Sequence, residues 1–439
     1  MKLAACATAL APTMRGHGQI RVLMSAYQCA PGEGSVSQIG WEWYSRMSAR
    51  VPVTLVTHIR NRPALEALGA PVNGSEIVYI DTEWFARPVY QLASRLFPRS
   101  QHAVFLLSSI DFYVYDAAAQ RLLSQRQREG AGWDVVHAVT PVSPIASTRL
   151  YRLGLPLIVG PWNGGLASPS NFPEIMKQDS AWLYPIRNLG LIVDLFLGGS
   201  RRAAAVLCAT AATRRSLPPA SRSRAVDMIE NGVDLDEFTA RDWPFTPGID
   251  GPLRILFVGR LVPFKGIPML LEAVSRFALE CPVEVRIVGG GPMQAEWTRQ
   301  AAAMGLSRCV AFCGPTPLSA VPAHMAWSHI FCLPSVRESG GAVLLEAMAA
   351  GRPVAAIAYG GPAELVDDSV GKAIPPDGRE SVVNALLAVF RDVIRRPDHW
   401  RRCGQEGRHR AEASFGWEAK MDRALSLYQQ VRVRPLGES

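Results

Sequence analysis

The sequence lacks the features that mark membrane-spanning and metal-stapled proteins. No stretch reaches the ~20 apolar residues that a transmembrane helix needs, and no Cys-x-x-Cys pair recurs among the eight cysteines. Charged residues are few, at 19%, whereas hydrophobic residues make up 48% of the chain, a balance typical of packed globular proteins. We therefore expect buried free thiols and a cytoplasmic setting, in which disulfides are rare.

A complete dinucleotide fingerprint is also missing. The segment 283–292, VEVRIVGGGP, is a strand followed by three glycines, but it lacks the third glycine of the G-x-G-x-x-G pattern. No acidic partner for a ribose is evident after it. The segment therefore predicts only a tight strand exit, and it argues against a nicotinamide-dependent oxidoreductase.

Short apolar runs alternate with helical stretches along most of the chain. Such alternation predicts βαβ units, whose parallel sheets are covered by helices on both faces. At 439 residues, the chain also exceeds the size at which single cores divide. We therefore expect two α/β domains, joined within the polar, proline-containing stretch 210–233.

The segment 334–361, PSVRESGGAVLLEAMAAGRPVAAIAYGG, carries the most specific pattern. Glu338 and Glu346 lie eight positions apart, around the pair Gly340-Gly341 and a run of strong helix formers. The glycines allow a ligand to approach the backbone, and the helix that follows would point unpaired N–H groups at that ligand. Phosphate-binding N–H groups flanked by carboxylates that accept hydroxyl groups predict a nucleotide-sugar site.

A second pattern, VGRLVPFKG at 258–266, follows the apolar run LRILFV, which reads as a buried parallel strand. Arg260 and Lys265 then lie on the loop that leaves the carboxyl end of this strand, where open α/β sheets bind their ligands. A departing nucleoside diphosphate needs fixed positive charge. Arginine supplies a planar fork of donors for it, and lysine supplies a point charge.

These motifs together resemble the retaining glycosyltransferases of family 4 (glycosyl transferases group 1), which have the two-domain GT-B fold. The resemblance implies that Glu338 holds hydroxyl groups of the donor sugar and that Glu346 holds the ribose. It also implies that the base contacts backbone near 312–316. The remaining donor contacts implied by the resemblance come from Arg260, Lys265, Gly259, Gly290, Gly314, Ser339, Gly340, Gly341 and Ala342.

The N-terminal half resembles the same family through its glycine loops. The expected first strand, 20–27, leads into QCAPGEGSVSQIGWEW, where Gly34 and Ser35 would lie beside the acceptor and the donor phosphate. A further Gly-Gly loop at the end of 152–165 contributes Asn163. All these loops are expected to meet at one cleft.

His137 is a candidate catalytic residue. Many relatives have His-x-His-x-Pro at this strand end, but Val139 takes the second histidine position here. The alternative is a strand-end histidine whose ring is satisfied by the backbone. Thr140, Asn163 or a residue of the N-terminal loop would then be the polar group that faces the acceptor.

Asp234 and Asp236 have the spacing of an Asp-x-Asp metal site. They lie in ENGVDLDEF, 230–238, which resembles the family's linker into the second domain, and the neighbouring residues predict a turn. We therefore expect no catalytic metal ion and no cofactor.

The expected boundaries follow the GT-B fold, with two Rossmann-like, doubly wound parallel-sheet domains. Residues 1–19 are expected to be a disordered leader, with Met14 as an alternative start, rather than a signal peptide. An acceptor-binding domain is expected over 20–215 and a nucleotide-sugar-binding domain over 216–416. The resemblance implies that the helix in 417–439 crosses back to the first domain.

A net charge of +8 calls for an anionic partner. The basic residues are dispersed without a recognition motif, so we do not expect nucleic acid. An anionic membrane surface fits better, because the stretches 95–129 and 184–205 combine basic with apolar residues. Their basic positions are Arg95, Arg99, Arg121, Arg126, Arg128, Arg201 and Arg202, beside Phe97, Phe105, Leu106 and Tyr113. Core helices with solvated arginines are the alternative.

The resemblance therefore implies a retaining, metal-independent hexosyltransferase that uses a nucleotide-diphosphate sugar. Its acceptor would be a hydroxyl group on a lipid-linked or growing glycan, in exopolysaccharide or lipopolysaccharide assembly. Such an enzyme would work in the cytoplasm, in peripheral contact with the inner face of the cell membrane. The alternative is a catalytically degenerate GT-B partner subunit, which the missing second histidine suggests.

Overall fold

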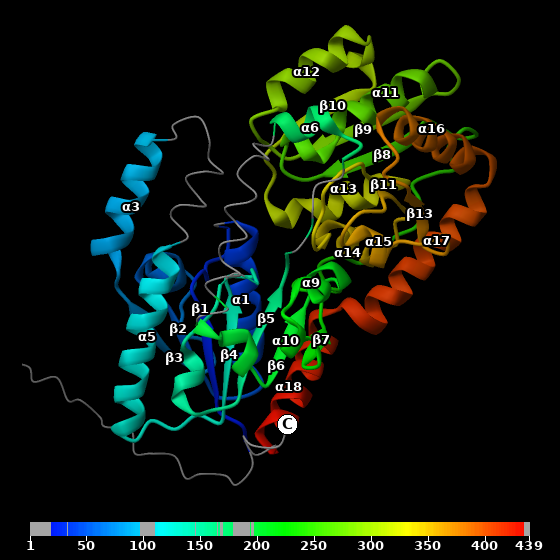
Figure 1. The fold of residues 1–439 in the computed structure, drawn as a ribbon. Coiled ribbons are helices and arrows are strands. Elements are labelled where there is room, and N and C mark those ends of the chain that lie inside the picture. The colour runs from blue at the N-terminus through cyan, green and yellow to red at the C-terminus, as the bar shows by residue number, and fades with distance from the viewer. Residues whose placement is uncertain are drawn as a thin grey trace, which may run out of the picture.

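Short segments in which most side chains are buried form two separate parallel sheets (Figure 1). The computed structural model describes residues 19–32, 34–96, 110–144, 146–164, 166, 170–178, 194 and 197–433. Both sheets have a doubly wound strand order, and helices cover their faces. The prediction of two doubly wound α/β domains is confirmed.

Within the described residues, the first sheet has seven strands in the order β3-β2-β1-β4-β5-β6-β7. Successive residues of β1 point to opposite faces, so Val22 and Met24 pack with α1 and α18, whereas Leu23 packs with α5. The strands are β1 (Val22–Ala26), β2 (Val53–His58), β3 (Glu76–Ile80), β4 (Val135–Thr140), β5 (Leu157–Trp162), β6 (Ala205–Cys208) and β7 (Ala225–Asp227).

The second sheet has six strands in the described part of the chain, in the order β10-β9-β8-β11-β12-β13. Its pairs are parallel, and its core is one continuous hydrophobic cluster. The strands are β8 (Leu253–Val258), β9 (Val283–Val288), β10 (Val310–Gly314), β11 (Ile330–Leu333), β12 (Val354–Ile357) and β13 (Gly371–Ile374).

The helices of the first domain, with the terminal helix that returns to it, are α1 (Ser35–Ser48), α2 (Arg62–Ala67), α3 (Glu83–Leu96), α5 (Asp111–Arg128), α6 (Pro173–Gln178), α8 (Gly199–Arg202), α9 (Ala211–Ser216), α10 (Pro219–Arg222) and α18 (Trp417–Val433). Those of the second domain are α11 (Ile267–Phe277), α12 (Gln294–Ala303), α13 (Val321–Trp327), α14 (Ala342–Ala349), α15 (Pro362–Leu365), α16 (Arg379–Arg395) and α17 (Pro397–Arg410). None of the described helices is both long enough and apolar enough to cross a membrane.

Two chain crossings join the domains, and they lie side by side. The Val233 N–H donates to the Phe415 carbonyl at 2.9 Å, and the Trp417 N–H donates to the Val233 carbonyl at 3.2 Å. After this point α18 runs back along the first domain, where Tyr428 is buried in its core (Figure 1). Since β7 pairs with β6 in the first sheet, that sheet extends past the expected division at residues 215 and 216.

A segment of the first domain's chain also reaches across to the second domain. Phe172, just before α6, is buried in the core cluster of the second domain. The side-chain amide of Asn171 donates to the Pro376 carbonyl at 3.0 Å. This arm ties the domains together at a distance from the two crossings (Figure 1).

Candidate active site

The carboxyl edge of the second sheet collects three of the predicted glycines. The strand order reverses between β8 and β11, which is the switch point where such sheets bind ligands. The Gly259 N–H donates to the Val288 carbonyl at 2.9 Å, the Leu261 N–H to Gly290 at 2.8 Å, and the Gly289 N–H to Gly314 at 2.9 Å. These bonds hold Gly259, Gly290 and Gly314 at adjacent strand exits.

Lys265 and Glu338 bring the two main sequence motifs together. Lys265 ends the short 3₁₀ turn Pro263–Lys265 after β8, and this turn is held against the exit of β11 because the Val336 N–H donates to the Phe264 carbonyl at 2.9 Å. The Lys265 ammonium donates to Glu338 Oε2 in an ion pair. Both side chains are largely buried, at 13% and 17% exposure, so water screens this pair weakly.

The residues Glu338–Gly341, hereafter the donor loop, lead directly into α14. Gly341 has φ +62°, a left-handed conformation that glycine adopts without strain, and α14 begins at Ala342. The first N–H groups of a helix have no intrahelical partners and attract anions. On its outer side the loop is held by the turn at 360–361, because the Gly361 N–H donates to the Glu338 carbonyl at 3.1 Å and a side chain at position 361 would clash with the Ser339 carbonyl.

Glu346 lies on α14 and is partly buried. Its burial, with a smaller contribution from the negative charge of Glu237, raises its pKa to about 7. Arg260 lies exposed on the loop that leaves β8. The second domain therefore presents cations, carboxyl groups and helix N–H groups from a single sheet edge.

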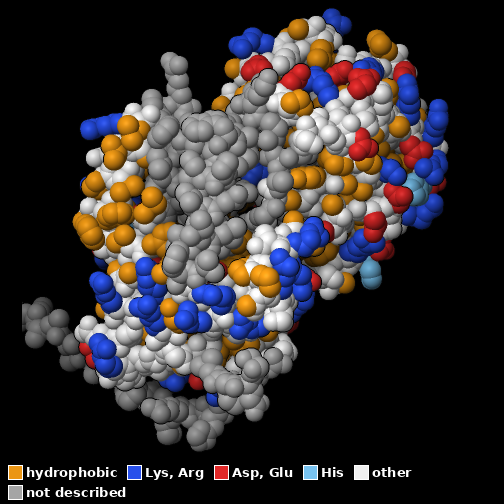
Figure 2. All heavy atoms as spheres, viewed as in Figure 1, with side chains coloured by type: hydrophobic (Ala, Val, Ile, Leu, Met, Phe, Trp, Pro, Cys, Tyr) orange, Lys and Arg blue, Asp and Glu red, His pale blue; other side chains and the backbone are white. Residues whose placement is uncertain are grey.

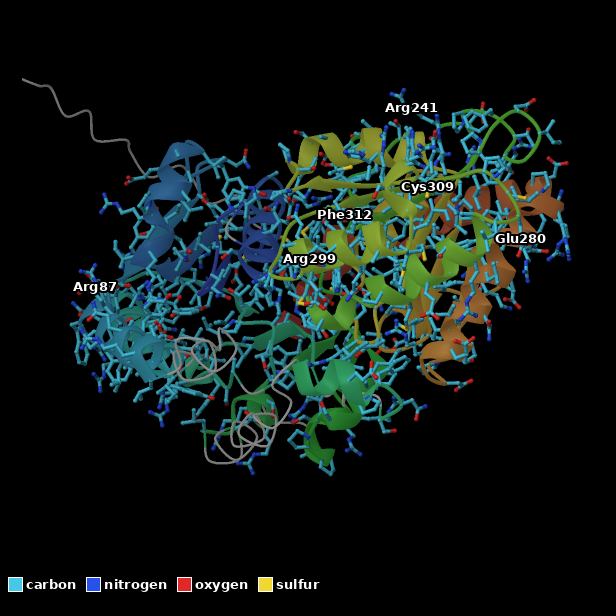
Figure 3. All side chains as sticks on the ribbon, turned by 90° about the horizontal axis from the view of Figure 1, so that it is seen from above. Arg87, Arg241, Glu280, Arg299, Cys309 and Phe312 are labelled. Carbon is cyan, nitrogen blue, oxygen red and sulfur yellow. The ribbon has the colours of Figure 1, made fainter. Side chains whose placement is uncertain are left out.

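The predicted N-terminal residues lie on the first domain. Gly34 precedes the first residue of α1, Ser35, and both are exposed on the loop that follows β1. Gly34 has φ +99°, which favours glycine there. In the view from above, Phe312 of β10 lies on the side of the second domain nearer the first, and Glu280 lies on the far side (Figure 3).

His137 is placed in the core of the first domain, and its prediction as a catalytic residue needs correction. Its ring is fully buried, with Nε2 donating to the Gly160 carbonyl at 2.7 Å and Nδ1 2.6 Å from the Tyr428 hydroxyl. Since a carbonyl can only accept, Nε2 carries the proton of the neutral ring, and Nδ1 therefore accepts from the Tyr428 hydroxyl. Burial lowers the pKa of His137 to about 4. Both nitrogens are occupied, Nε2 by the backbone, as the alternative expects, and Nδ1 by the Tyr428 side chain.

The side chain of Asn163 contacts Glu230, a residue that was not among the predicted site residues. Its side-chain amide donates to Glu230 Oε1, and Glu230 is only 3% exposed. Two buried oxygens of this pair, Asn163 Oδ1 and Glu230 Oε2, have no hydrogen-bond partner among the described residues. The sequence signal for a buried carboxyl group at Glu230 was an acidic residue that directly follows the apolar pair Met228-Ile229.

Asp234 forms a turn, as its neighbours predict. Its Oδ1 accepts from the N–H groups of Asp236 at 3.0 Å and Glu237 at 3.1 Å. Its Oδ2 forms an ion pair with Arg46 at 2.8 Å, which links the turn to α1. These contacts hold the start of the second domain against the first.

A cavity of about 450 Å³ lies between the arm at Asn171–Ile175 and helices α11 and α12. Pro263 and Gly266 border it, but none of the predicted site residues lines it. The donor loop and the glycines of the strand exits, not this cavity, therefore define the candidate site.

Residues 240–410 match the family model described as glycosyl transferases group 1. The chain is 32% identical over 217 residues to a D-inositol 3-phosphate glycosyltransferase of Geodermatophilus obscurus, covering 46% of each chain. It is also 32% identical over 226 residues to a GDP-mannose-dependent alpha-(1-6)-phosphatidylinositol monomannoside mannosyltransferase of Mycolicibacterium smegmatis, covering 47% of this chain and 56% of that one. The match thus spans about half the length of these curated relatives.

Solved structures match over nearly the whole chain. HepE of Anabaena, in complex with UDP and glucose, has a TM-score of 0.61 at 16% identity and covers 94% of this chain and 100% of its own. WaaG, a glycosyltransferase involved in lipopolysaccharide biosynthesis, has a TM-score of 0.58 at 17% identity, covering 93% and 99%. At these identities the likeness establishes the fold. The chain therefore has the GT-B fold, and its residues 240–410 match the glycosyl transferases group 1 family.

Proposed function

We propose that this protein is a retaining glycosyltransferase of family 4 that moves a hexose from a nucleotide-diphosphate sugar to a hydroxyl acceptor. The observation that carries the proposal is the contact between Lys265 and Glu338 beside the N-terminus of α14. It puts a fixed cation, a carboxylate that accepts hydroxyl groups, and helix N–H groups at one switch-point edge. A diphosphate attached to a sugar needs each of these groups.

Each side chain has a separate role in this proposal. Glu338 accepts hydrogen bonds from hydroxyl groups of the donor sugar, and Glu346 accepts from the ribose. Arg260, Lys265 and the N–H groups that open α14 stabilise the charge that develops on the diphosphate as its bond to the sugar breaks. The acceptor oxygen attacks from the face that the diphosphate leaves, and its proton passes to the leaving phosphate oxygen. No protein nucleophile is needed, and the sugar keeps its anomeric configuration.

A sugar acceptor on a lipid carrier or growing glycan is the class we favour. The relatives include a mannosyltransferase that acts on a phosphatidylinositol mannoside, and WaaG is involved in lipopolysaccharide biosynthesis. The complex of HepE with UDP and glucose supports a nucleotide-sugar donor. These names support a glycan product such as an exopolysaccharide or lipopolysaccharide.

An exposed apolar face supports peripheral contact with an anionic membrane, and we propose that this contact is made at its cytoplasmic side. On α3, Trp84 is 73% exposed and Leu96 is 62% exposed. Figure 2 shows hydrophobic side chains gathered over this helix, and Arg87 lies at the far end of the first domain (Figure 3). Of the stretches expected to dock, Arg99 and most of 184–205 lie outside the described residues. A face that combines apolar with basic residues suits a lipid interface.

We also propose that the reaction is independent of divalent metal, because protein cations and helix N–H groups supply the charge that a metal ion otherwise provides. Activity should survive excess chelator within a factor of about two, the scatter of small condition effects. Asp236→Asn should likewise leave turnover intact. Loss of activity in chelator, with recovery on adding magnesium or manganese, would contradict this part of the proposal.

A thermal-shift screen across nucleotides and nucleotide sugars tests the proposed function. A ligand that binds only the folded state at a hundredfold excess over its Kd adds roughly 3 kcal/mol to the free energy of unfolding. We expect stabilisation by at least one nucleoside diphosphate and by its sugar conjugate. NMR of the product should then show the anomeric configuration of the donor. If no nucleoside diphosphate stabilises the protein, the proposed function is wrong.

A further inference from the structure

The donor loop rests on the carboxyl group of Glu230. A Cβ at position 340 would overlap Glu230 Oε1 and lie 2.8 Å from Oε2, so Gly340 leaves the space that this carboxyl group fills. The backbone of Gly340 does not have a left-handed φ, so the only objection to alanine there is steric. A residue of the chain crossing thus supports the loop that leads into α14.

The same carboxyl group is held from the first domain. Asn163 follows β5, and its own N–H is fixed by donation to the Val142 carbonyl at 2.7 Å. From there its side-chain amide donates to Glu230 Oε1. Gly340, Glu230 and Asn163 therefore form a continuous chain of contacts from the second domain to the first.

Gly340 also faces residues of the two chain crossings. A cavity of about 370 Å³ borders it there, lined among others by Asn231, Gly361 and Lys420. A loop beside an open cavity has room to shift unless one contact limits it. The carboxyl group of Glu230 makes such a contact, in addition to the turn at 360–361.

Burial disfavours the ionised form of the Glu230 carboxyl group. Burial raises its pKa, and the negative charge of Glu338 acts in the same direction, whereas Lys420 opposes them. The ammonium group of Lys420 is itself buried, which lowers its pKa to about 7, and it donates to the Asn231 carbonyl.

We propose that Glu230 is a positioning residue, whose carboxyl group holds the donor loop in place and, through Asn163, fixes that loop to the first domain. This role of Glu230 deepens the proposed function, and its kinetic tests rest on that function. The position of the loop itself can be measured without any activity.

Hydrogen–deuterium exchange of the full-length protein provides that measurement. Removing the carboxyl group in Glu230→Ala should speed exchange of the Leu344 and Gly361 amides, which donate to the Gly341 and Glu338 carbonyls of the loop, by about tenfold, the size of one lost hydrogen bond. Glu230→Gln keeps the shape and an acceptor for Asn163, so it should exchange like the wild type. Asp236→Asn, in the same chain crossing but exposed, is the matched control. Unchanged exchange in Glu230→Ala would overturn the proposal.

A double-variant cycle tests the contact with Gly340 itself. Gly340→Ala places a methyl group on the carboxyl group of Glu230, so donor KM should rise at least about tenfold, a typical effect of overpacking. Adding Glu230→Ala removes the obstacle, and the double variant should recover most of that loss. If the effects of the two single variants on donor KM simply add in the double variant, the contact between Gly340 and Glu230 is refuted. If no variant, nor the wild type, turns over any donor while the exchange pattern holds, the positioning role stands and the proposed function fails.

Discussion

In the proposed reaction, Lys265 and Arg260 would provide the positive charge at the leaving group. Replacing either by alanine should lower turnover by at least about a hundredfold, because one preorganised charge contact contributes about 3 kcal/mol to the barrier. Steady-state rates with the donor found by the ligand screen measure this effect. The free energy of unfolding should change little for Arg260→Ala, since that side chain is exposed.

Lys372→Ala is the matched control for these variants, because Lys372 pairs with Asp368 on the surface of the same domain. It should leave turnover unchanged, as exposed ion pairs contribute little. Normal turnover in Arg260→Ala or Lys265→Ala would show that the leaving group is held elsewhere.

The two glutamates of the donor motif should differ in what they bind. Glu338→Gln should lower turnover with the intact donor and leave the affinity for the bare nucleoside diphosphate nearly unchanged. Glu346→Gln should weaken the bare nucleotide. Isothermal titration of the nucleotide with both variants measures this split, and equal effects on nucleotide affinity would contradict it.

The raised pKa of Glu346 adds a pH signature to this test. The carboxyl group keeps its proton up to about pH 7, and the better acceptor, the carboxylate, forms only above that pH. Nucleotide affinity should therefore rise with pH through about 7 in the wild type and stay flat in Glu346→Gln. Folding stability should show the opposite dependence on pH. The stabilisation that comes from the raised pKa of Glu346 is lost as pH rises through about 7.

At the scale of elements, α18 and β4 are joined by the contact between Tyr428 and His137. Tyr428→Phe leaves Nδ1 of the buried ring without a donor, which should lower the free energy of unfolding by about 1–3 kcal/mol. The kcat and its pH profile should not change, because the ring lies in the core. Tyr90→Phe on α3, where the ring is 57% exposed, is the control. A shifted pH profile in Tyr428→Phe would return His137 to the catalytic residues.

The elements around the donor loop could be predicted from the sequence, because their signals are local. LRILFV, the glycine pair and the helix formers of α14 each lie within one short window. The roles of His137 and Glu230 could not be predicted in this way. The side-chain partner of His137, Tyr428, lies 291 residues further along the chain. Glu230 gains its proposed role only through its contacts with Asn163 and Gly340, which are far from it in the sequence. Buried polar contacts between distant elements leave no periodic trace.

At the scale of the whole molecule, α3 presents its apolar face at one end of the first domain. Vesicles that contain anionic phospholipid should co-sediment with the protein, and added salt should weaken this binding. The double variant Leu92→Ser with Leu96→Ser should reduce binding at least about tenfold, because burying each leucine side chain in lipid contributes about 1–2 kcal/mol to the binding free energy. Leu279→Ser is the control, since that leucine is 89% exposed on the second domain. Equal binding of the double variant and the wild type would exclude α3 as the docking face.

Because Val233 and Gly416 pair where both crossings pass between the domains, we expect any rotation of one domain against the other to turn about this point. Displacement then grows with distance from that axis, as along a lever. Gly340 borders Glu230 of the crossing and should move little, whereas α6, which follows the contact between Asn171 and Pro376, lies farther from the crossings (Figure 1). The arm, with Phe172 buried in the core of the second domain and Asn171 bonded to Pro376, should therefore resist domain rotation more strongly than a contact of the same strength beside the crossings.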